Sequence, residues 1–145
     1  MRPETGDMRQ ETRTGRRFKG IKAWQKADDL VALIYRATRT FPREEQYGLT
    51  SQMRRAAVSV AANIVEGSAR RSKQEYLQFL GIAKASLSEL AYYVHLSTRL
   101  AYLPASQSHT EELDSLCEET ARVLYGLMQA VSQDRLDAVV AGDQL

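Results

Sequence analysis

The stretch AAVSVAANIVEGSARRSKQEYLQFL, residues 56–80, decides the fold because it holds a helix, its end and the start of the next helix. Its first ten residues carry only two polar side chains, Ser59 and Asn63, which lie four apart and therefore on one helix face. A helix at the surface of a lone bundle has a broad polar side. We therefore expect this helix to be buried nearly all round, with its extra apolar surface covered by another subunit.

The polar side chains of this helix recur at spacings of three and four, which places them along one face. This polar stripe consists of Gln52, Arg55, Ser59, Asn63 and Glu66. Buried polar groups normally pair with one another. We therefore interpret Gln52, Asn63 and Glu66, together with Glu89 of the following helix, as a structural polar network. Arg55 has Glu66 and Glu89 as alternative ion-pair partners.

The second half of the stretch carries a helix stop and a helix start. Glu66-Gly67 predicts a helix end with the glycine in the left-handed conformation of a C-cap. Ser72-Lys73-Gln74-Glu75 matches the S-x-x-E capping box. A third helix should follow from Lys73 to about Ala101. Its predicted core line is Tyr76, Leu80, Ala83, Leu87, Leu90 and Val94.

Outward from this stretch, the same periodicity predicts two more helices. The first runs from about Lys22 to Thr40 and ends before Phe41-Pro42, because the residue before proline is driven out of the α region. Glu44 and Glu45 then precede the positive start of the second helix, expected over 47–66. A fourth helix, over 108–132, follows a second S-x-x-E. Its predicted core line is Leu113, Leu116, Thr120, Val123, Leu127 and Ala130.

Four helices with short connections and no alternating strand pattern predict an all-α, up-down-up-down antiparallel four-helix bundle over 18–132. Residues 1–17 hold five arginines and three acidic residues without apolar periodicity, and predict a flexible tail. Residues 133–145 predict a polar C-terminal tail. At 145 residues, the chain suits one domain with one core.

Composition limits the class of protein. No apolar run approaches the roughly 18 residues that a membrane span needs, and the single cysteine, Cys117, cannot form an intramolecular disulfide. We expect a cytoplasmic protein. Residues 1–99 carry a net charge of +8, whereas residues 100–145 carry −6. This asymmetry suits nucleic acid at one end or association between unlike faces, but solvated helix faces would also produce it.

The motifs of catalysis and metal binding do not occur in this sequence. His95 and His109 lack the spacing of a metal site, and Cys117 has no basic residue nearby to activate it. The glycines Gly48, Gly67 and Gly81 are isolated and form no phosphate-binding loop. We therefore expect no enzyme, no metal and no cofactor.

Basic residues are the remaining functional signal, because phosphate binding needs lysine or arginine repeated along a surface. The candidate nucleic-acid-binding residues are Arg54, Arg55, Arg70, Arg71, Lys73 and Lys84. The second helix is roughly 30 Å long, with the first pair near its start and the next three past its end, which predicts two clusters in one subunit. The aromatic residues nearby, Tyr47, Tyr76 and Phe79, fit core spacing better than a platform for stacked bases.

Several segments together resemble a known family. They are FKGIKAWQKADDLVALIYRATRTFP from residue 18, YGLTSQMRRAAVSVAANIVEG from residue 47, RRSKQEYLQFLGIAKASLSEL from residue 70, and YLPASQ from residue 102. The chain resembles, over about 18–130, the four-helix-bundle proteins encoded in intervening sequences of bacterial large-subunit ribosomal RNA genes. Ala85 stands where the family usually has glycine, a change that suits a helix.

The resemblance implies a ring-shaped homopentamer of four-helix bundles and no catalytic residues. A related group, the accessory variability determinants of diversity-generating retroelements, has a similar fold and is thought to bind nucleic acid and a reverse transcriptase through basic surfaces. We therefore expect a non-enzymatic homo-oligomer that binds RNA or DNA through its basic residues. The alternative is a protein-interaction scaffold, such as an accessory protein to a reverse transcriptase.

Overall fold

The computed structural model describes residues 17–103 and 108–134, and within these residues the protein is all-α. Its four long helices are α2 (Lys22–Ala37), α3 (Leu49–Ser68), α4 (Lys73–Arg99) and α5 (Ser108–Ser132). Single 3-10 turns lie at Phe18–Gly20, Thr38–Thr40 and Arg43–Glu45, and no strand occurs in the described ranges. The tails predicted at 1–17 and 133–145 fall almost wholly outside the described residues.

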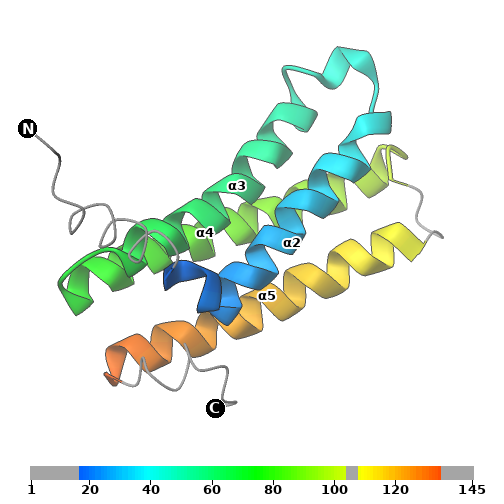
Figure 1. Ribbon diagram of the computed structural model, residues 1–145. Helices are drawn as coiled ribbons and strands as arrows, with labels where there is room; N and C mark the ends of the chain where they lie inside the picture. The colour runs from blue at the N-terminus through cyan, green and yellow to red at the C-terminus, as the bar shows by residue number, and fades with distance from the viewer. Residues whose placement is uncertain (1–16, 104–107, 135–145) are drawn as a thin grey trace, which may run out of the picture.

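The four helices lie side by side around one apolar core (Figure 1). The contact between α3 and α4 is the most extensive, and α2 and α5 pack against each other and against α3 and α4 respectively. The largest fully buried side chains come from all four helices. They are Leu30, Ile34, Met53, Val60, Ile64, Leu80, Leu90, Val94, Leu113, Leu124, Leu127 and Val131. None of the helices in the described ranges is long and apolar enough to cross a membrane.

Local signals in the sequence set most helix boundaries as predicted. The Glu75 N–H donates to Ser72 Oγ at 3.1 Å, which confirms Ser72 as the N-cap of α4. The Leu49 N–H donates to Glu45 Oε2 at 3.0 Å, so Glu45 caps the positive end of α3 as expected. The whole predicted core line of α4 is buried. α4 ends at Arg99, where Ala101 turns into the left-handed region with a φ of 61°.

The predicted end of the helix before Gly67 is wrong. α3 continues through Gly67 to Ser68, and its C-cap residue, Ala69, keeps a right-handed φ of −87°. Gly67 is needed for a different reason, which is the closeness of α4. A Cβ atom at Gly67 would lie 2.9 Å from Phe79 Cβ and 3.0 Å from Tyr76 Cδ1, closer than carbon atoms normally approach. The glycine therefore lets two helices touch.

The core line of α5 differs from the predicted one by a small rotation. Leu113, Thr120, Leu127 and Ala130 are buried as predicted. Leu116 and Val123 are only partly buried, and their neighbours take the central positions. These neighbours are Cys117, Leu124 and Val131. Because α5 packs against both α4 and α2, its buried face is wider than a single heptad-like line.

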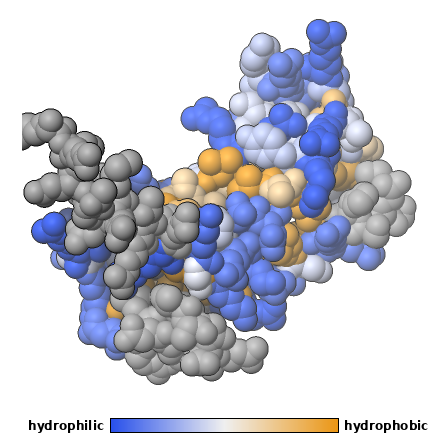
Figure 2. Space-filling view, viewed as in Figure 1, coloured by the Kyte–Doolittle hydropathy of each residue, from blue (hydrophilic) through white to orange (hydrophobic). Residues whose placement is uncertain are grey.

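One chain does not bury α3 all round, in contrast to the expectation from its apolar sequence. Val58 keeps 42% of its surface exposed, and Ala62, one turn further along, is also exposed. Figure 2 shows hydrophobic surface over the middle of α3, between hydrophilic regions. Val58 follows Arg54 by four residues and Arg55 by three, so this apolar patch lies beside these arginines on the exposed face of α3.

Gly67→Ala should lower the free energy of unfolding by about 1–2 kcal/mol, because the new methyl group overpacks the contact with Phe79. Gly81→Ala is the matched control, since a Cβ atom there meets nothing within 4 Å. This control should raise stability by about 0.5–1 kcal/mol through helix propensity. Chemical denaturation measures both. Equal stability of the two variants would contradict a tight contact at Gly67.

Candidate nucleic-acid interface

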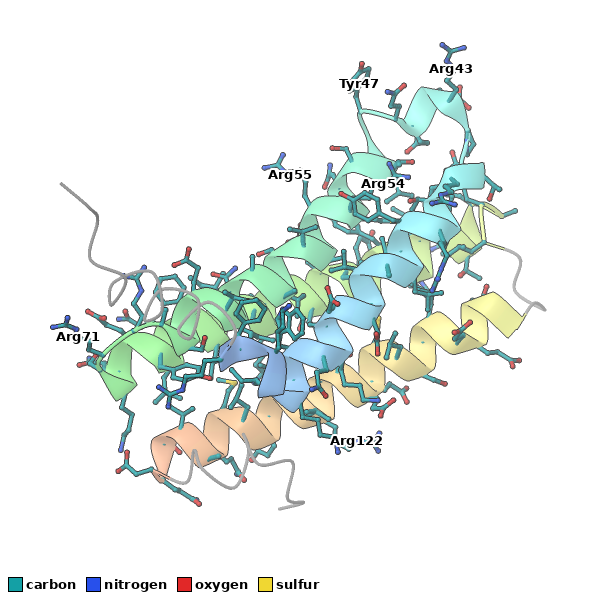
Figure 3. The ribbon with its side chains drawn as sticks, viewed as in Figure 1. Arg43, Tyr47, Arg54, Arg55, Arg71 and Arg122 are labelled. Atoms are coloured by element: carbon teal, nitrogen blue, oxygen red, sulfur yellow. The ribbon has the colours of Figure 1, made fainter. Side chains whose placement is uncertain are left out.

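The basic candidates occupy separate parts of the molecule. Arg54 and Arg55 lie in the first half of α3, near the connection that carries Tyr47, whereas Arg71 lies at the opposite end (Figure 3). Lys84 is exposed on α4, where it lines a hollow of about 230 Å³ shared with α5. The structure therefore does not gather the six basic residues on one surface of a single chain.

Arg54 is committed to holding α2 against α3. Its Nε donates to Thr38 Oγ1 at 2.9 Å, and its Nη2 donates to the Tyr35 carbonyl oxygen at 3.5 Å. Its guanidinium lies 4.6 Å from the centre of the Tyr35 ring, a cation–π contact. These contacts bind the carbonyl end of α2, where a positive charge is favourable. Arg54 is thus occupied within the bundle.

Arg55, its neighbour in sequence, points away from the bundle (Figure 3). It is exposed and makes no hydrogen bond or ion pair with any described residue. Neither Glu66 nor Glu89, the two partners expected from the sequence, pairs with it. The separation of the two arginines follows from the 100° turn between successive residues of a helix.

Two basic side chains in the turn between α3 and α4 form ion pairs. Arg70 pairs with Glu66 at 3.2 Å and stacks on Phe79, with its guanidinium 4.8 Å from the ring centre. Lys73 pairs with Asp134 at 3.4 Å. All of these ionic groups are solvent-exposed, and such pairs contribute only about 0–1 kcal/mol. Arg70 and Lys73 can therefore release their carboxylates and bind a phosphate with little loss of free energy. Arg71 makes no hydrogen bond or ion pair with a described residue.

The polar stripe of α3 separates into pieces instead of forming one network. Ser59 Oγ and Ser86 Oγ lie 2.7 Å apart across the α3–α4 contact, and Asn63 Nδ2 donates to the Ser59 carbonyl oxygen at 2.8 Å. Nearer the start of α3, Tyr93 Oη contacts Gln52 Oε1 at 2.6 Å and also Glu89 Oε1. Glu66 takes part in neither piece, because it pairs with Arg70.

Tyr93 is a member of this cluster that sequence reasoning missed. Its only signal in the sequence is its position four residues after Glu89, on the same face of α4. The hydrogen bond to Glu89, with smaller contributions from burial and from the nearby Glu89 and Tyr92, raises the pKa of Tyr93 above its ordinary value. The phenol therefore keeps its proton at neutral pH and remains a donor.

A polar groove of about 410 Å³ lies between α3 and α4 beside these residues. We call it the α3–α4 groove, and its lining residues are Tyr47, Ser51, Gln52, Arg55, Ala56, Ser59, Ser86 and Glu89. Tyr47 is 91% exposed, so the prediction that it fits the core is wrong. Tyr76 is buried, and Phe79 is covered in part by Arg70. The groove thus combines a free guanidinium, a carboxylate and a bare aromatic ring.

Cys117 does not have the environment of a nucleophile. The thiol is buried, and burial, with smaller effects of Asp114 and Glu118, raises its pKa to about 11. Nucleophilic cysteines have a lowered pKa. Across the described ranges, no group of His, Cys, Asp and Glu residues comes together in a way that could hold a metal ion.

Comparisons with known proteins agree with this fold. A family profile described as 23S rRNA-intervening sequence protein matches residues 19–126. A crystal structure of a protein with unknown function from the S23 ribosomal protein family of Bacteroides thetaiotaomicron has 20% sequence identity and a TM-score of 0.64. The similarity covers 73% of this chain and 97% of that one. At this identity it shows a shared fold, and no curated protein matches the sequence.

Arg54→Ala and Arg55→Ala should differ in stability although the residues are adjacent. Arg54→Ala removes two hydrogen bonds and a cation–π contact, and should lower the free energy of unfolding by about 1–2 kcal/mol. Arg55→Ala should change it by less than about 0.5 kcal/mol. Thermal and chemical denaturation measure the difference. A loss of stability in Arg55→Ala equal to that in Arg54→Ala would contradict these assignments.

Proposed function

This chain belongs to the 23S rRNA-intervening sequence protein family, and from that premise we propose that it is a non-enzymatic homo-oligomer that binds nucleic acid through its basic surface. The observation that carries the proposal is the environment of Arg55. This guanidinium has no partner among the described residues and lines the same groove as the exposed ring of Tyr47. An uncompensated arginine beside an exposed aromatic ring suits an unpaired base, which can hydrogen-bond to the guanidinium and stack on the ring.

The turn between α3 and α4 supplies the second part of the proposed surface. Arg71 is exposed, and the exposed ion pairs of Arg70 and Lys73 can open toward a phosphate. Arg54 is not part of the surface, because α2 occupies its guanidinium. RNA is the favoured ligand, since unpaired bases that stack on side chains are a feature of single-stranded loops. We also propose that the protein is cytoplasmic.

We further propose that the protein is an up-down-up-down antiparallel bundle that assembles as a ring-shaped homopentamer. The apolar patch of α3 around Val58 and Ala62 supports self-association, because a second copy would remove it from water. A closed ring would also repeat Arg70 and Arg71 around its axis. Repeated cations add phosphate contacts, and these raise affinity and its salt dependence together.

Affinity for a structured RNA should fall steeply as salt increases, because each phosphate contact releases counterions. The double variant Arg70→Ala with Arg71→Ala should reduce the slope of log affinity against log salt by about 1 for each contact removed. Arg122→Ala on α5 is the matched control and should leave the slope unchanged. Fluorescence anisotropy over a salt series measures this. Affinity that is independent of salt, or an unchanged slope in the double variant, would refute the proposal.

Light scattering should give a mass of five times the chain's 16.3 kDa, since the apolar patch of α3 is expected to lie between copies. Val58→Glu places a charge in that interface and should shift the mass toward a single chain. Gln74→Glu adds the same charge at an exposed position of α4 and should leave the mass unchanged. A single-chain mass for the unmodified protein, with its helix content intact, would exclude the ring.

A further inference from the structure

The α3–α4 groove has a surplus of hydrogen-bond acceptors. Tyr93 has one phenolic proton, yet its oxygen lies within hydrogen-bond distance of Gln52 Oε1 and of Glu89 Oε1. If the Gln52 amide is turned so that its nitrogen donates to Tyr93, its own oxygen loses that donor. In either orientation, one acceptor oxygen is left without a donor among the described residues. Glu89 Oε2 likewise accepts no hydrogen bond from a described residue.

The same groove has a surplus of donors on its other side. Arg55 presents a guanidinium with five N–H groups, none of which donates to a described residue. Arg55 and Glu89 line one groove but form no ion pair with each other. A ligand that fits must therefore offer donors on one edge and acceptors on another.

We infer that the α3–α4 groove is a pocket for one unpaired guanine base of a bound RNA. The inference rests on the proposed nucleic-acid binding and names the base that the surface selects. Guanine carries two adjacent donors, N1–H and the N2 amino group, that match a carboxylate. It also carries two adjacent acceptors, O6 and N7, that match an arginine bidentately. Adenine, cytosine and uracil lack this combination of edges.

The size and lining of the groove leave room for a base. Its volume is about 410 Å³, and its lining includes the small side chains of Ala56, Ser59 and Ser86. The Ser59 and Ser86 hydroxyls lie 2.7 Å apart, and their hydrogen bond uses one of the two hydroxyl protons. The ring of Tyr47, 91% exposed, lies at the groove and provides a face on which a base can stack.

The charge of the groove favours a base within RNA over a free nucleotide. Among the described residues that line it, Arg55 is the one that is basic. One guanidinium is too few to compensate a nucleoside diphosphate or triphosphate together with the nearby carboxylate of Glu89. An RNA chain can instead place its neighbouring phosphates on other basic residues of the surface.

The test compares the affinities of the full chain for two RNA hairpins. The hairpins differ only in one unpaired loop base, which is guanine or inosine. Inosine keeps O6 and N7 but lacks the N2 amino group. We expect about tenfold weaker binding of the inosine hairpin. Glu89→Gln should abolish this preference without changing the salt slope, whereas Glu75→Gln, at an exposed position of the same helix, should retain it. Circular dichroism checks that each variant keeps its helix content.

The outcomes separate this inference from the proposed function. Salt-dependent binding with equal affinity for both hairpins, or a preference that survives Glu89→Gln, would overturn the guanine pocket and leave nucleic-acid binding intact. Protein that binds neither hairpin at low salt would overturn both. A final experiment adds free guanosine monophosphate to the protein and measures its binding by NMR of labelled tyrosines. Free nucleotide that binds as tightly as the guanine hairpin would assign the groove to a small molecule and overturn the RNA assignment.

Discussion

The close contact between α3 and α4 is the constraint on which the rest of the molecule depends. At one end Gly67 lies against Phe79 and Tyr76 with no room for a methyl group. Further along, Ser59 and Ser86 bring their hydroxyls together at 2.7 Å. Only small side chains allow two helices to approach in this way, and the resulting contact is the most extensive in the fold. A larger residue at either place would separate the helices and change the groove beside them.

This contact also explains how the polar stripe of α3 is satisfied. Side chains that face α4 find partners there: Ser59 bonds to Ser86, and Gln52 reaches Tyr93. Arg55 lies further from α4 around the helix and finds none among the described residues. The edge of the stripe that faces α4 is therefore a structural contact, whereas the edge that carries Arg55 is an open polar surface. We place the candidate site at this change because a charged group without a protein partner is available to a ligand.

The sequence indicated the kind of surface but not its members. Six basic residues were candidates, and nothing in their identity distinguished those held within the bundle from those exposed to solvent. Arg54 and Arg55 are adjacent, and only the position of Tyr35 and Thr38 on a neighbouring helix determines that Arg54 is occupied. For a related reason, Tyr47 was wrongly assigned to the core and Tyr93 was missed. The connection before α3 leaves Tyr47 in solvent, and the α3–α4 packing places Gln52 within reach of Tyr93.

The sequence by itself determined the four helices, most of their boundaries and the core line of α4. These features depend on interactions between residues three or four apart, such as the Ser72 cap and the apolar periodicity, which a linear pattern records directly. Only the tertiary structure decided why Gly67 is a glycine, which arginine is free and where the groove lies. Each of these depends on distances between helices that are remote in sequence. The amino-acid sequence of one helix does not determine which side chains pack against it.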